Sequence, residues 1–308
     1  MLRLNQIRDL LMVLECGSVR AAAAKLGVSQ PAVTKSVRSL EAELGVELLH
    51  RSTLGVTPTP AGVAFAARAK VAQLELDRAR EEVTVARGRG GLSLNVGVGS
   101  APMALVAVQA IVRFRAEHPL SRMRVIEGPG QRLLPLLRDG SIDLALAQRV
   151  NPAFAPGLKY RPLLRTRLAV VGRKGHPLLH ARSLAELSEA EWLVYRPPNS
   201  DGLLEQAMRA EGLPFPARFI HCESFALTLA LVRASDLLAL LVPQAILDPH
   251  GGLQEIPLKR PPPEISVGMY RRTDTPPSVA MNGFTGHLVR CVREAVAASA
   301  WPGTLRTG

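Results

Sequence analysis

The stretch that decides the fold is GSVRAAAAKLGVSQPAVTKSVRSLEAELGVELLHR, residues 17–51. It predicts a short helix that Ser18 can cap and Gly27 can end, with apolar positions at helical spacing: Val19, Ala22, Ala23 and Leu26. Ser29 offers the next N-cap, and a second apolar face follows before Gly45: Ala32, Val33, Val37, Leu40 and Leu44. Two helices joined by a short turn that contains glycine are the helix-turn-helix pattern.

The residues on either side complete a small domain. A preceding helix is predicted by an apolar face: Ile7, Leu10, Leu11 and Leu14. The segment LLHRSTLGVTPT, residues 48–59, has strand-like residues around Leu54-Gly55 and predicts a hairpin, or wing. We therefore predict an N-terminal winged helix-turn-helix domain over residues 1–59.

Residues 60–91 predict a long helix followed by a hinge. Apolar side chains recur at alternating steps of four and three: Phe65, Ala69, Ala72, Leu76, Ala79, Val83 and Ala86. Because such a narrow heptad seam needs a partner helix, we expect this linker helix to form a homodimer. The alternative is a single amphipathic helix that lies on its own domain. Gly88-Arg89-Gly90-Gly91 is typical of a flexible hinge.

The rest of the chain alternates strand and helix patterns. Strands are predicted at 92–98, 123–128 and 142–147, and again four times over 165–243. The chain then returns with a strand at 265–272 and a last helix over about 277–299. Such alternation predicts a parallel sheet covered by helices. The expected fold class is thus an α/β multidomain protein whose two C-terminal lobes comprise residues 92–164 with 266–301, and residues 165–265.

The sharpest charge bias lies between Cys16 and Leu40, where four basic residues and no acidic one occur: Arg20, Lys25, Lys35 and Arg38. A helix of this kind fits the major groove of double-stranded DNA. Gln30 and Thr34 can hydrogen-bond to bases, and Pro31 can touch a thymine methyl group. Phosphate contacts are expected from Ser18, Arg20, Lys35, Arg38 and, in the wing, Arg51. For any one residue, the alternative is a solvated helix face.

The stretch from Leu10 through Gly62 resembles the DNA-binding domain of LysR-type transcriptional regulators. The ordered motifs A-A-x-x-L, S-Q-P-A and L-E-x-x-L-G carry the resemblance, with TPAG at 59–62. GQRLLPLLRDGSIDLALA (130–147) and VVGRKGHPL (170–178) are similar to the family's effector-domain signatures. His50 and Pro58 depart from the pattern, which affects only local packing of the wing. The resemblance implies a two-lobe effector domain like a periplasmic binding protein, and a homotetramer that bends promoter DNA and alters contact with RNA polymerase.

In two-lobe α/β domains, ligands bind in the crevice at the carboxyl ends of strands. Six candidate effector-binding residues lie in loops after predicted strands: Ser100, Gln148, Arg196, Ser200, Ser224 and Phe225. We expect a small organic anion with its acid group near Ser100, where the free N–H groups of a helix start can bind an anion. The alternative is that each loop is only a turn. Glu223 could repel an anion or pair with a cation, and both readings stay open.

Other functions are disfavoured by composition and missing motifs. The net charge of +12 favours a polyanionic partner, but an aromatic content of 4% disfavours binding by base stacking. The three cysteines, Cys16, Cys222 and Cys291, show no pairing or zinc spacing, so we expect no cofactor and a reducing, cytoplasmic location. Neither a dinucleotide fingerprint nor a G-x-S-x-G elbow occurs, so an enzyme is not expected. A solute-binding protein is the other rival, but there is no signal peptide and no bilayer-spanning stretch.

Overall fold

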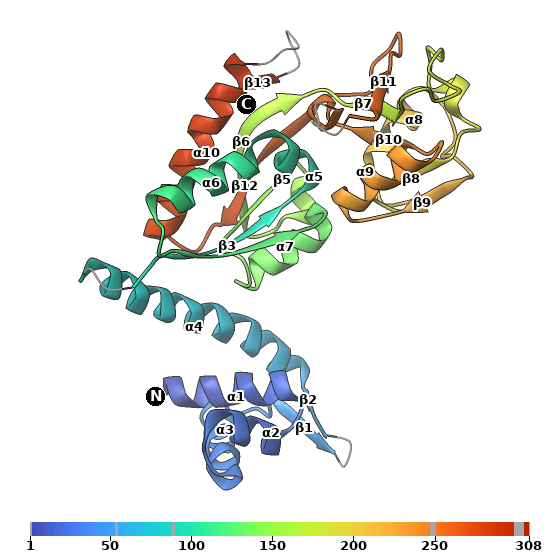
Figure 1. Ribbon diagram of the computed structural model, residues 1–308. Coiled ribbons are helices and arrows are strands. Elements are labelled where there is room, and N and C mark those ends of the chain that lie inside the picture. Colours follow the sequence, from blue (N-terminus) through green and yellow to red (C-terminus); the bar gives the residue numbers. More distant parts are fainter. Residues whose placement is uncertain (1, 53–54, 88–89, 247–250, 299–304, 308) are drawn as a thin grey trace. The chain divides into compact units, whose positions relative to one another are not determined.

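The predicted helix-turn-helix is confirmed by the computed structural model, which describes residues 2–52, 55–87, 90–246, 251–298 and 305–307 (Figure 1). The chain divides into two units, Met1–Gly90 and Gly91–Gly308. The first unit contains α1 (Leu4–Cys16), α2 (Val19–Leu26) and α3 (Gln30–Leu44), followed by the wing strands β1 (Leu49–Ser52) and β2 (Gly55–Pro58). The wing strands pair antiparallel. Leu54, which the wing prediction included, lies outside the described residues.

Glycine and serine residues set the helix ends of the first unit. Gly27 and Gly45 end α2 and α3 at φ angles of 69° and 67°, which side chains with a Cβ rarely adopt. Ser18 caps α2 as predicted, because its hydroxyl accepts a hydrogen bond from the Ala21 amide at 3.4 Å. Ser29 is the N-cap residue of α3 as predicted, but its side chain forms no capping hydrogen bond.

The third helix and the wing surround one apolar core. Leu10, Val13, Val37, Leu40 and Leu48 are all buried there. Leu10, Val37 and Leu40 were predicted from the helical spacing, whereas Val13 was not, and Leu48 comes from the start of the wing. The opposite side of α3 is consequently free to face solvent.

The linker helix α4 (Pro60–Ala86) begins at a well-anchored cap. The Thr59 hydroxyl accepts a hydrogen bond from the Gly62 amide at 2.9 Å and donates one to the Glu47 carbonyl at 2.7 Å. Gly62 packs so closely that a Cβ there would lie 2.0 Å from the Leu48 carbonyl oxygen. Thr59 and Gly62 of the TPAG motif therefore join the linker helix to the wing.

The predicted heptad seam runs from a buried to an exposed end. Phe65 packs against the core of the first unit, and Ala69 is 5% exposed. Farther along, Leu76 is 41% exposed and Val83 is 55% exposed. This far part of the seam is therefore uncovered among the described residues. Residues 88–89 of the predicted hinge lie outside the described residues.

The second unit has two sheets (Figure 1). The larger has the strand order β13-β6-β12-β5-β3-β4. Its strands are β3 (Ser93–Val98), β4 (Arg122–Glu127), β5 (Leu144–Gln148), β6 (Leu158–Thr166), β12 (Ile265–Arg272) and β13 (Leu305–Thr307). The first three are parallel, whereas β12 runs antiparallel to both β5 and β6.

Helices cover this larger sheet. A continuous helical segment comprises α5 (Ser100–Pro102), a π-helical turn (Met103–Ala107) and α6 (Val108–Glu117). It packs on α10 (Val279–Ala297) through the edge-to-face pair Phe114 and Phe284, whose ring centroids are 5.9 Å apart. The remaining helix, α7 (Gly130–Arg138), packs against β5 and β12.

The smaller sheet has the strand order β11-β7-β10-β8-β9. Its strands are β7 (Ala169–Arg173), β8 (Trp192–Val194), β9 (Phe219–His221), β10 (Leu238–Leu241) and β11 (Leu253–Ile256), and its helices are α8 (Leu203–Ala210) and α9 (Phe225–Ala234). Trp192 is fully buried in its core, where the indole N–H donates to the Leu187 carbonyl at 3.1 Å. Short 3-10 turns occur at Pro152–Phe154, Ala185–Leu187 and Pro243–Ile246.

The prediction of a parallel sheet holds for only part of each sheet: β3 pairs in parallel with β4 and β5, and β8 with β9 and β10. Both sheets are mixed, because β7 also runs antiparallel to its neighbours β10 and β11. Strands β6, β11 and β13 were not predicted. The chain leaves the larger sheet after β6 and re-enters it at β12, so that Thr166 and Ile265 are paired neighbours. Within the described residues, no helix combines the length and apolar character that a bilayer crossing requires.

Candidate nucleic-acid interface and ligand pocket

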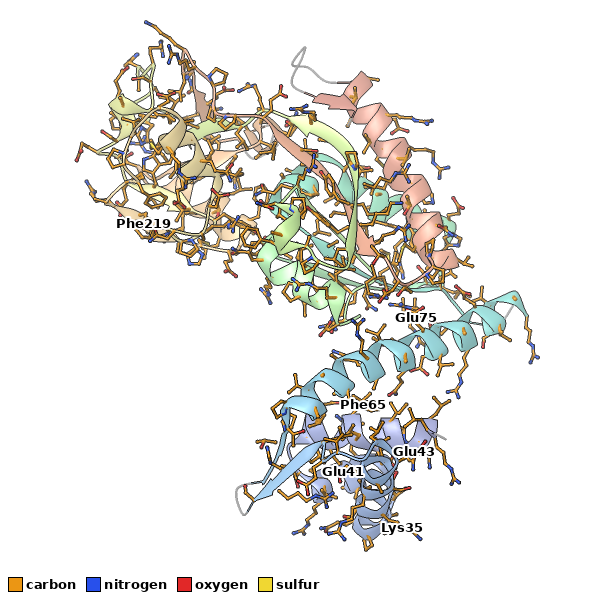
Figure 2. The ribbon with its side chains drawn as sticks, turned by 180° about the vertical axis from the view of Figure 1, so that it is seen from behind. Lys35, Glu41, Glu43, Phe65, Glu75 and Phe219 are labelled. Atoms are coloured by element: carbon orange, nitrogen blue, oxygen red, sulfur yellow. The ribbon has the colours of Figure 1, made fainter. Side chains whose placement is uncertain are left out.

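The face of α3 opposite the core carries the residues predicted to contact DNA. Gln30, Pro31, Lys35 and Arg38 are exposed and Thr34 is half-buried. Together with Ser39, these five side chains line one shallow surface depression. Figure 2 shows Lys35 on the outer side of α3. Neither Lys35 nor Arg38 forms an ion pair with any described residue, so both charges are available to a ligand.

The remaining predicted contacts flank α3. Ser18 lies at the start of α2, where its hydroxyl is already used as the helix cap, and Arg20 is exposed in the first turn of that helix. Arg51 lies on β1, and its guanidinium is 3.5 Å from the Glu41 carboxylate. The structure therefore places Arg51 beside the C-terminal half of α3, held by an acidic residue.

Glu41 is a structural residue whose role the sequence reasoning missed. One of its carboxylate oxygens accepts hydrogen bonds from the Leu48 and Leu49 amides at 2.9 and 3.1 Å, and the other faces Arg51. These bonds fix the start of the wing relative to α3, on which Glu41 lies (Figure 2). The available signal was the glutamate of the L-E-x-x-L-G motif.

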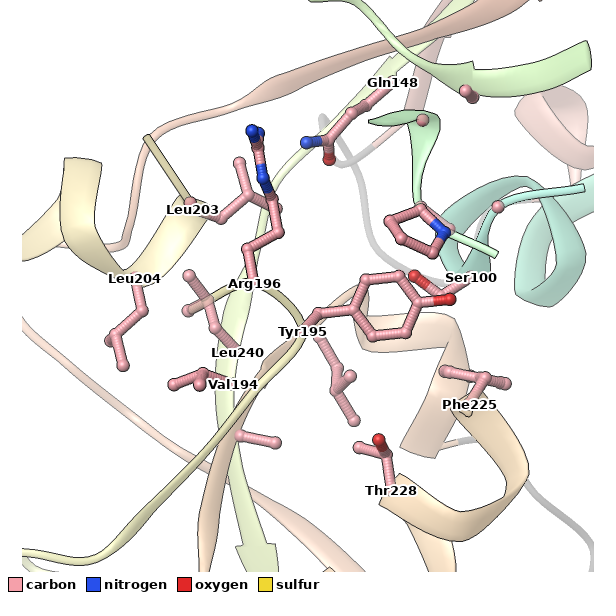
Figure 3. A pocket seen from close by; sticks show the side chains of 18 of the residues that line it. Ser100, Gln148, Val194, Tyr195, Arg196, Leu203, Leu204, Phe225, Thr228 and Leu240 are labelled. Atoms are coloured by element: carbon pink, nitrogen blue, oxygen red, sulfur yellow. The ribbon is translucent and has the colours of Figure 1, made fainter. Parts of the chain in front are cut away.

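A cavity of about 100 Å³ lies between the two sheets of the second unit. Four of the six predicted effector-binding residues line it: Ser100, Gln148, Arg196 and Phe225 (Figure 3). The other two, Ser200 and Ser224, do not. Apolar side chains from the smaller sheet and its helices make up much of the remaining wall, among them Val194, Leu203, Leu204 and Leu240.

Three polar atoms in the wall of this cavity are buried without a hydrogen-bond partner among the described residues. They are the hydroxyl oxygens of Tyr195 and Thr228 and the Nε atom of Arg196. Leaving a buried polar group unsatisfied costs about 1–3 kcal/mol. Such a cluster in a single cavity indicates a site that a polar ligand completes.

The two ends of the cavity differ in electrostatics. Burial, followed by the negative charges of Glu127 and Glu223, raises the pKa of Tyr195. Ser100 lies beside the Tyr195 hydroxyl and opposes this pKa shift, without the geometry of a hydrogen bond (Figure 3). Burial also lowers the pKa of Arg196, whose side chain points away from Tyr195 and toward Gln148 (Figure 3).

A hydrogen bond joins the two lobes beside the cavity. Glu127, at the end of β4 in the larger sheet, accepts a hydrogen bond from the Phe225 amide at 2.7 Å. Phe225 begins α9 of the other lobe, so the carboxylate lies at the positive end of that helix. The Ser224 hydroxyl caps the same helix by accepting from the Leu227 amide at 3.3 Å, which accounts for its position outside the cavity.

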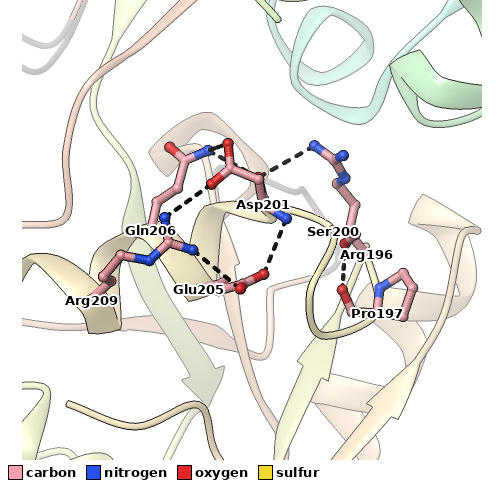
Figure 4. A network of polar contacts seen from close by, with 7 residues as sticks. All are labelled: Arg196, Pro197, Ser200, Asp201, Glu205, Gln206 and Arg209. Atoms are coloured by element: carbon pink, nitrogen blue, oxygen red, sulfur yellow. Dashed lines mark hydrogen bonds and ion pairs between the residues drawn. The ribbon is translucent and has the colours of Figure 1, made fainter. Parts of the chain in front are cut away.

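The loop between β8 and α8 holds Arg196 through a polar network (Figure 4). Arg196 donates a hydrogen bond to the Asp201 carbonyl at 3.3 Å. The Asp201 carboxylate in turn accepts hydrogen bonds from the side chains of Gln206 and Arg209. Asn199 and Asp201 have φ angles of 62° and 54°, in the left-handed region. Ser200 hydrogen-bonds within the loop to the Pro197 carbonyl. The loop is therefore internally bonded, and it contributes Tyr195, Arg196 and Gly202 to the cavity wall.

Tyr195 and Thr228 are candidate ligand-contacting residues that sequence reasoning missed. Tyr195 was included in a predicted strand, and Thr228 lies in a helix after Phe225. The only signal was their position, one residue before Arg196 and one helical turn after Ser224. Cys222 is buried with its thiol 3.5 Å from the Ser224 carbonyl, consistent with a structural role.

Known proteins match both units of the chain. The model of the bacterial regulatory helix-turn-helix protein, lysR family, matches residues 4–63, and that of the LysR substrate binding domain matches residues 87–292. The HTH-type transcriptional regulator GalR of Pseudomonas putida is 28% identical over 293 residues, which cover 92% of this chain and 71% of that protein. GbpR of Rhizobium radiobacter is 31% identical over 243 residues, covering 77% and 80% of the two chains.

Solved structures show the same fold. Full-length CbnR complexed with its target DNA matches with a TM-score of 0.67 at 20% identity, covering 94% of this chain and all of that one. A full-length variant of OxyR from Pseudomonas aeruginosa matches with a TM-score of 0.66 at 21% identity, covering 95% of each chain. The chain belongs to the LysR family: it is a helix-turn-helix transcriptional regulator that joins a DNA-binding domain to an effector-binding domain.

Proposed function

We propose that the exposed face of α3 reads operator DNA in the major groove. Gln30 and Thr34 hydrogen-bond to base edges, and Pro31 touches a thymine methyl group. Phosphates are held by the flanking polar and basic residues Ser18, Arg20, Lys35, Arg38 and Arg51. The observation that carries this proposal is one surface depression that gathers the α3 side chains around Lys35 and Arg38, which have no ion-pair partner within the described ranges.

We further propose that a small organic acid binds in the cavity between the lobes and contacts Ser100, Gln148, Arg196 and Phe225. Effector binding favours one arrangement of the lobes over another, which is a population shift. In the assembled regulator this changes the spacing and bend of the bound DNA, and so its contact with RNA polymerase. Such a protein acts in the cytoplasm and catalyses no reaction.

A homodimer through α4 is part of the same proposal. Leu76 and Val83 continue the heptad seam beyond the first unit and are exposed in the single chain. A second copy of α4 would cover both residues and bring two recognition helices onto one operator. Pairing of two dimers would give the homotetramer that the family resemblance implies.

Binding of the purified full-length chain to a duplex from its own upstream region tests the DNA proposal. Lys35→Ala should weaken binding to specific and unrelated duplexes alike and reduce the salt slope by about one ion. Gln30→Ala should cost about 1–3 kcal/mol on the specific duplex only. Lys259→Ala removes the same charge from an exposed position in the second unit and is the matched control. A Lys35→Ala protein with an unchanged salt slope would contradict the assignment.

A further inference from the structure

The cavity between the lobes adjoins a second, outer pocket of about 220 Å³. The two share four lining residues: Gln131, Gln148, Val150 and Arg196. Arg196 thus lies at the junction. Its Nε is buried without a hydrogen-bond partner among the residues that the structure describes, and its Nη1 donates to a carbonyl of its own loop. A ligand in the inner cavity can reach the outer pocket past this arginine.

The outer pocket is cationic. Arg138 and Arg149 line it with Arg196, and none of the three forms an ion pair with a described carboxylate. Arg138 donates to the Phe154 carbonyl, and the Arg149 guanidinium lies 5.9 Å from the centre of the Tyr160 ring. The one acidic residue in the wall, Asp201, is already bonded to Gln206 and Arg209. An acid group at this end would therefore meet three guanidinium groups that form no ion pair with a described carboxylate, although Asp201 and Glu205 act on Arg196 with negative charge from a greater distance.

The inner end has the opposite character. Thr228 is 3% exposed, and its hydroxyl has no hydrogen-bond partner in the described part of the chain, like the buried hydroxyl of Tyr195. Each hydroxyl can donate one hydrogen bond and accept others. Glu127 and Glu223 act on Tyr195 with negative charge, which disfavours an anion there and favours a neutral group. Leu203, Leu240 and Phe225 supply apolar surface for the rest of a ligand.

We propose that the effector is a hydroxylated ring acid bound in one orientation, with its carboxylate at Arg196 and the outer arginines and its hydroxyl at Tyr195 and Thr228. The apolar ring then spans the cavity. This orientation reverses the sequence-based expectation, which put the acid group near Ser100. The proposal rests on the proposed effector role of the cavity. It adds the chemical class of the ligand and the residues that contact each end of it.

Isothermal titration calorimetry of the full-length chain with three probes tests the orientation: 4-hydroxybenzoate, benzoate and phenol. The hydroxyl should make 4-hydroxybenzoate bind about 5-fold more tightly than benzoate, as one net hydrogen bond does. Arg196→Gln should weaken both acids at least 10-fold and phenol less than 2-fold. Arg149→Gln, at an exposed outer position, should weaken the acids about 3-fold and serves if the Arg196 variant does not fold.

The hydroxyl end has its own variants. Thr228→Val and Tyr195→Phe should each bring the ratio of 4-hydroxybenzoate to benzoate affinity toward one, while benzoate itself stays within 2-fold. Ser200→Ala removes a hydroxyl from the neighbouring loop that does not line the cavity, and it should leave the ratio unchanged. A ratio that persists in the Thr228→Val and Tyr195→Phe double variant overturns the proposal. So does acid binding that is indifferent to both arginine variants.

Duplex binding by the same preparations separates this proposal from the wider one. If the protein binds its specific duplex but none of the three probes, the hydroxylated ring acid is rejected as the effector. The proposal that α3 reads operator DNA then still holds. Acid binding with the expected arginine dependence, but without duplex binding, rejects the DNA proposal and supports the ligand assignment.

Discussion

Removal of the Glu127 carboxylate should loosen the contact between the two lobes. Its hydrogen bond from the Phe225 amide is 2.7 Å long, partly buried, and has a charged acceptor at the start of a helix. Hydrogen bonds to charged groups contribute about 1.5–3 kcal/mol. Glu127→Ala should therefore shift the equilibrium toward separated lobes by about 10- to 150-fold. Glu127→Gln keeps an acceptor oxygen and should show a smaller shift.

Hydrogen exchange measured at single amides reads this shift directly. Exchange at the Phe225 amide should accelerate in Glu127→Ala, whereas the Leu227 amide keeps its partner in the Ser224 cap and serves as the internal control. Glu223→Gln is the matched variant, because Glu223 also acts on Tyr195 but has no bond to Phe225. That variant should leave the exchange of the Phe225 amide unchanged.

The same variants make a second, independent measurement possible. The negative charges of Glu127 and Glu223 both raise the pKa of Tyr195, so Glu127→Gln and Glu223→Gln should each lower it. The chain has only three tyrosines, and Tyr195→Phe identifies the relevant step in an ultraviolet titration at high pH. Unchanged Phe225 exchange in Glu127→Ala, together with an unchanged Tyr195 pKa, would refute the role of this carboxylate between the lobes.

Three further outcomes are expected. Leu76→Asp places a charge on the exposed seam of α4 and should halve the mass measured by sedimentation equilibrium; an unchanged mass would count against α4 as the dimer contact. Thr59→Ala removes both hydrogen bonds at the start of α4 and should cost the first unit about 1–3 kcal/mol in urea unfolding, whereas Thr57→Ala on the exposed wing should be nearly neutral. Burial raises the pKa values of Tyr160 and Tyr270. The stability that these neutral hydroxyls contribute is therefore complete below about pH 10 and is lost as the pH rises through the raised pKa values. The free energy of unfolding should fall by up to about 1.4 kcal/mol per pH unit for each tyrosine. Melting temperatures that stay constant above pH 10 would contradict that sign.

The DNA-binding end was predictable because its signals are local. The caps, the apolar spacing and the acid-free polar face all fall within a few turns of helix, and the apolar residues they marked, such as Val37 and Leu40, form the core. The exception was Ser29, whose capping hydrogen bond depends on a side-chain orientation that spacing does not determine. Glu41 was overlooked for a related reason, because its partners are amides of the wing that only the folded chain brings near.

The second unit was less predictable because its geometry is nonlocal. Strand direction depends on which distant strands pair. The residues of β12 therefore carry no local pattern from which its antiparallel pairing with β5 and β6 could be predicted. Strand β6 also contains Pro162, next to a register shift in its pairing with β12, which weakens the alternation that identifies strands. Tyr195 and Thr228 become candidate ligand contacts only when the two lobes enclose a cavity.

The pairing of Thr166 with Ile265 makes the smaller lobe a continuous insertion between two adjacent strands. Excision of residues 167–264 would leave two chain ends that lie side by side and could be joined by a tight turn. The larger lobe would keep its strand order, and a foreign lobe could be grafted at the same two points. Sensors with new ligand preferences could therefore be assembled on an unaltered operator-reading module.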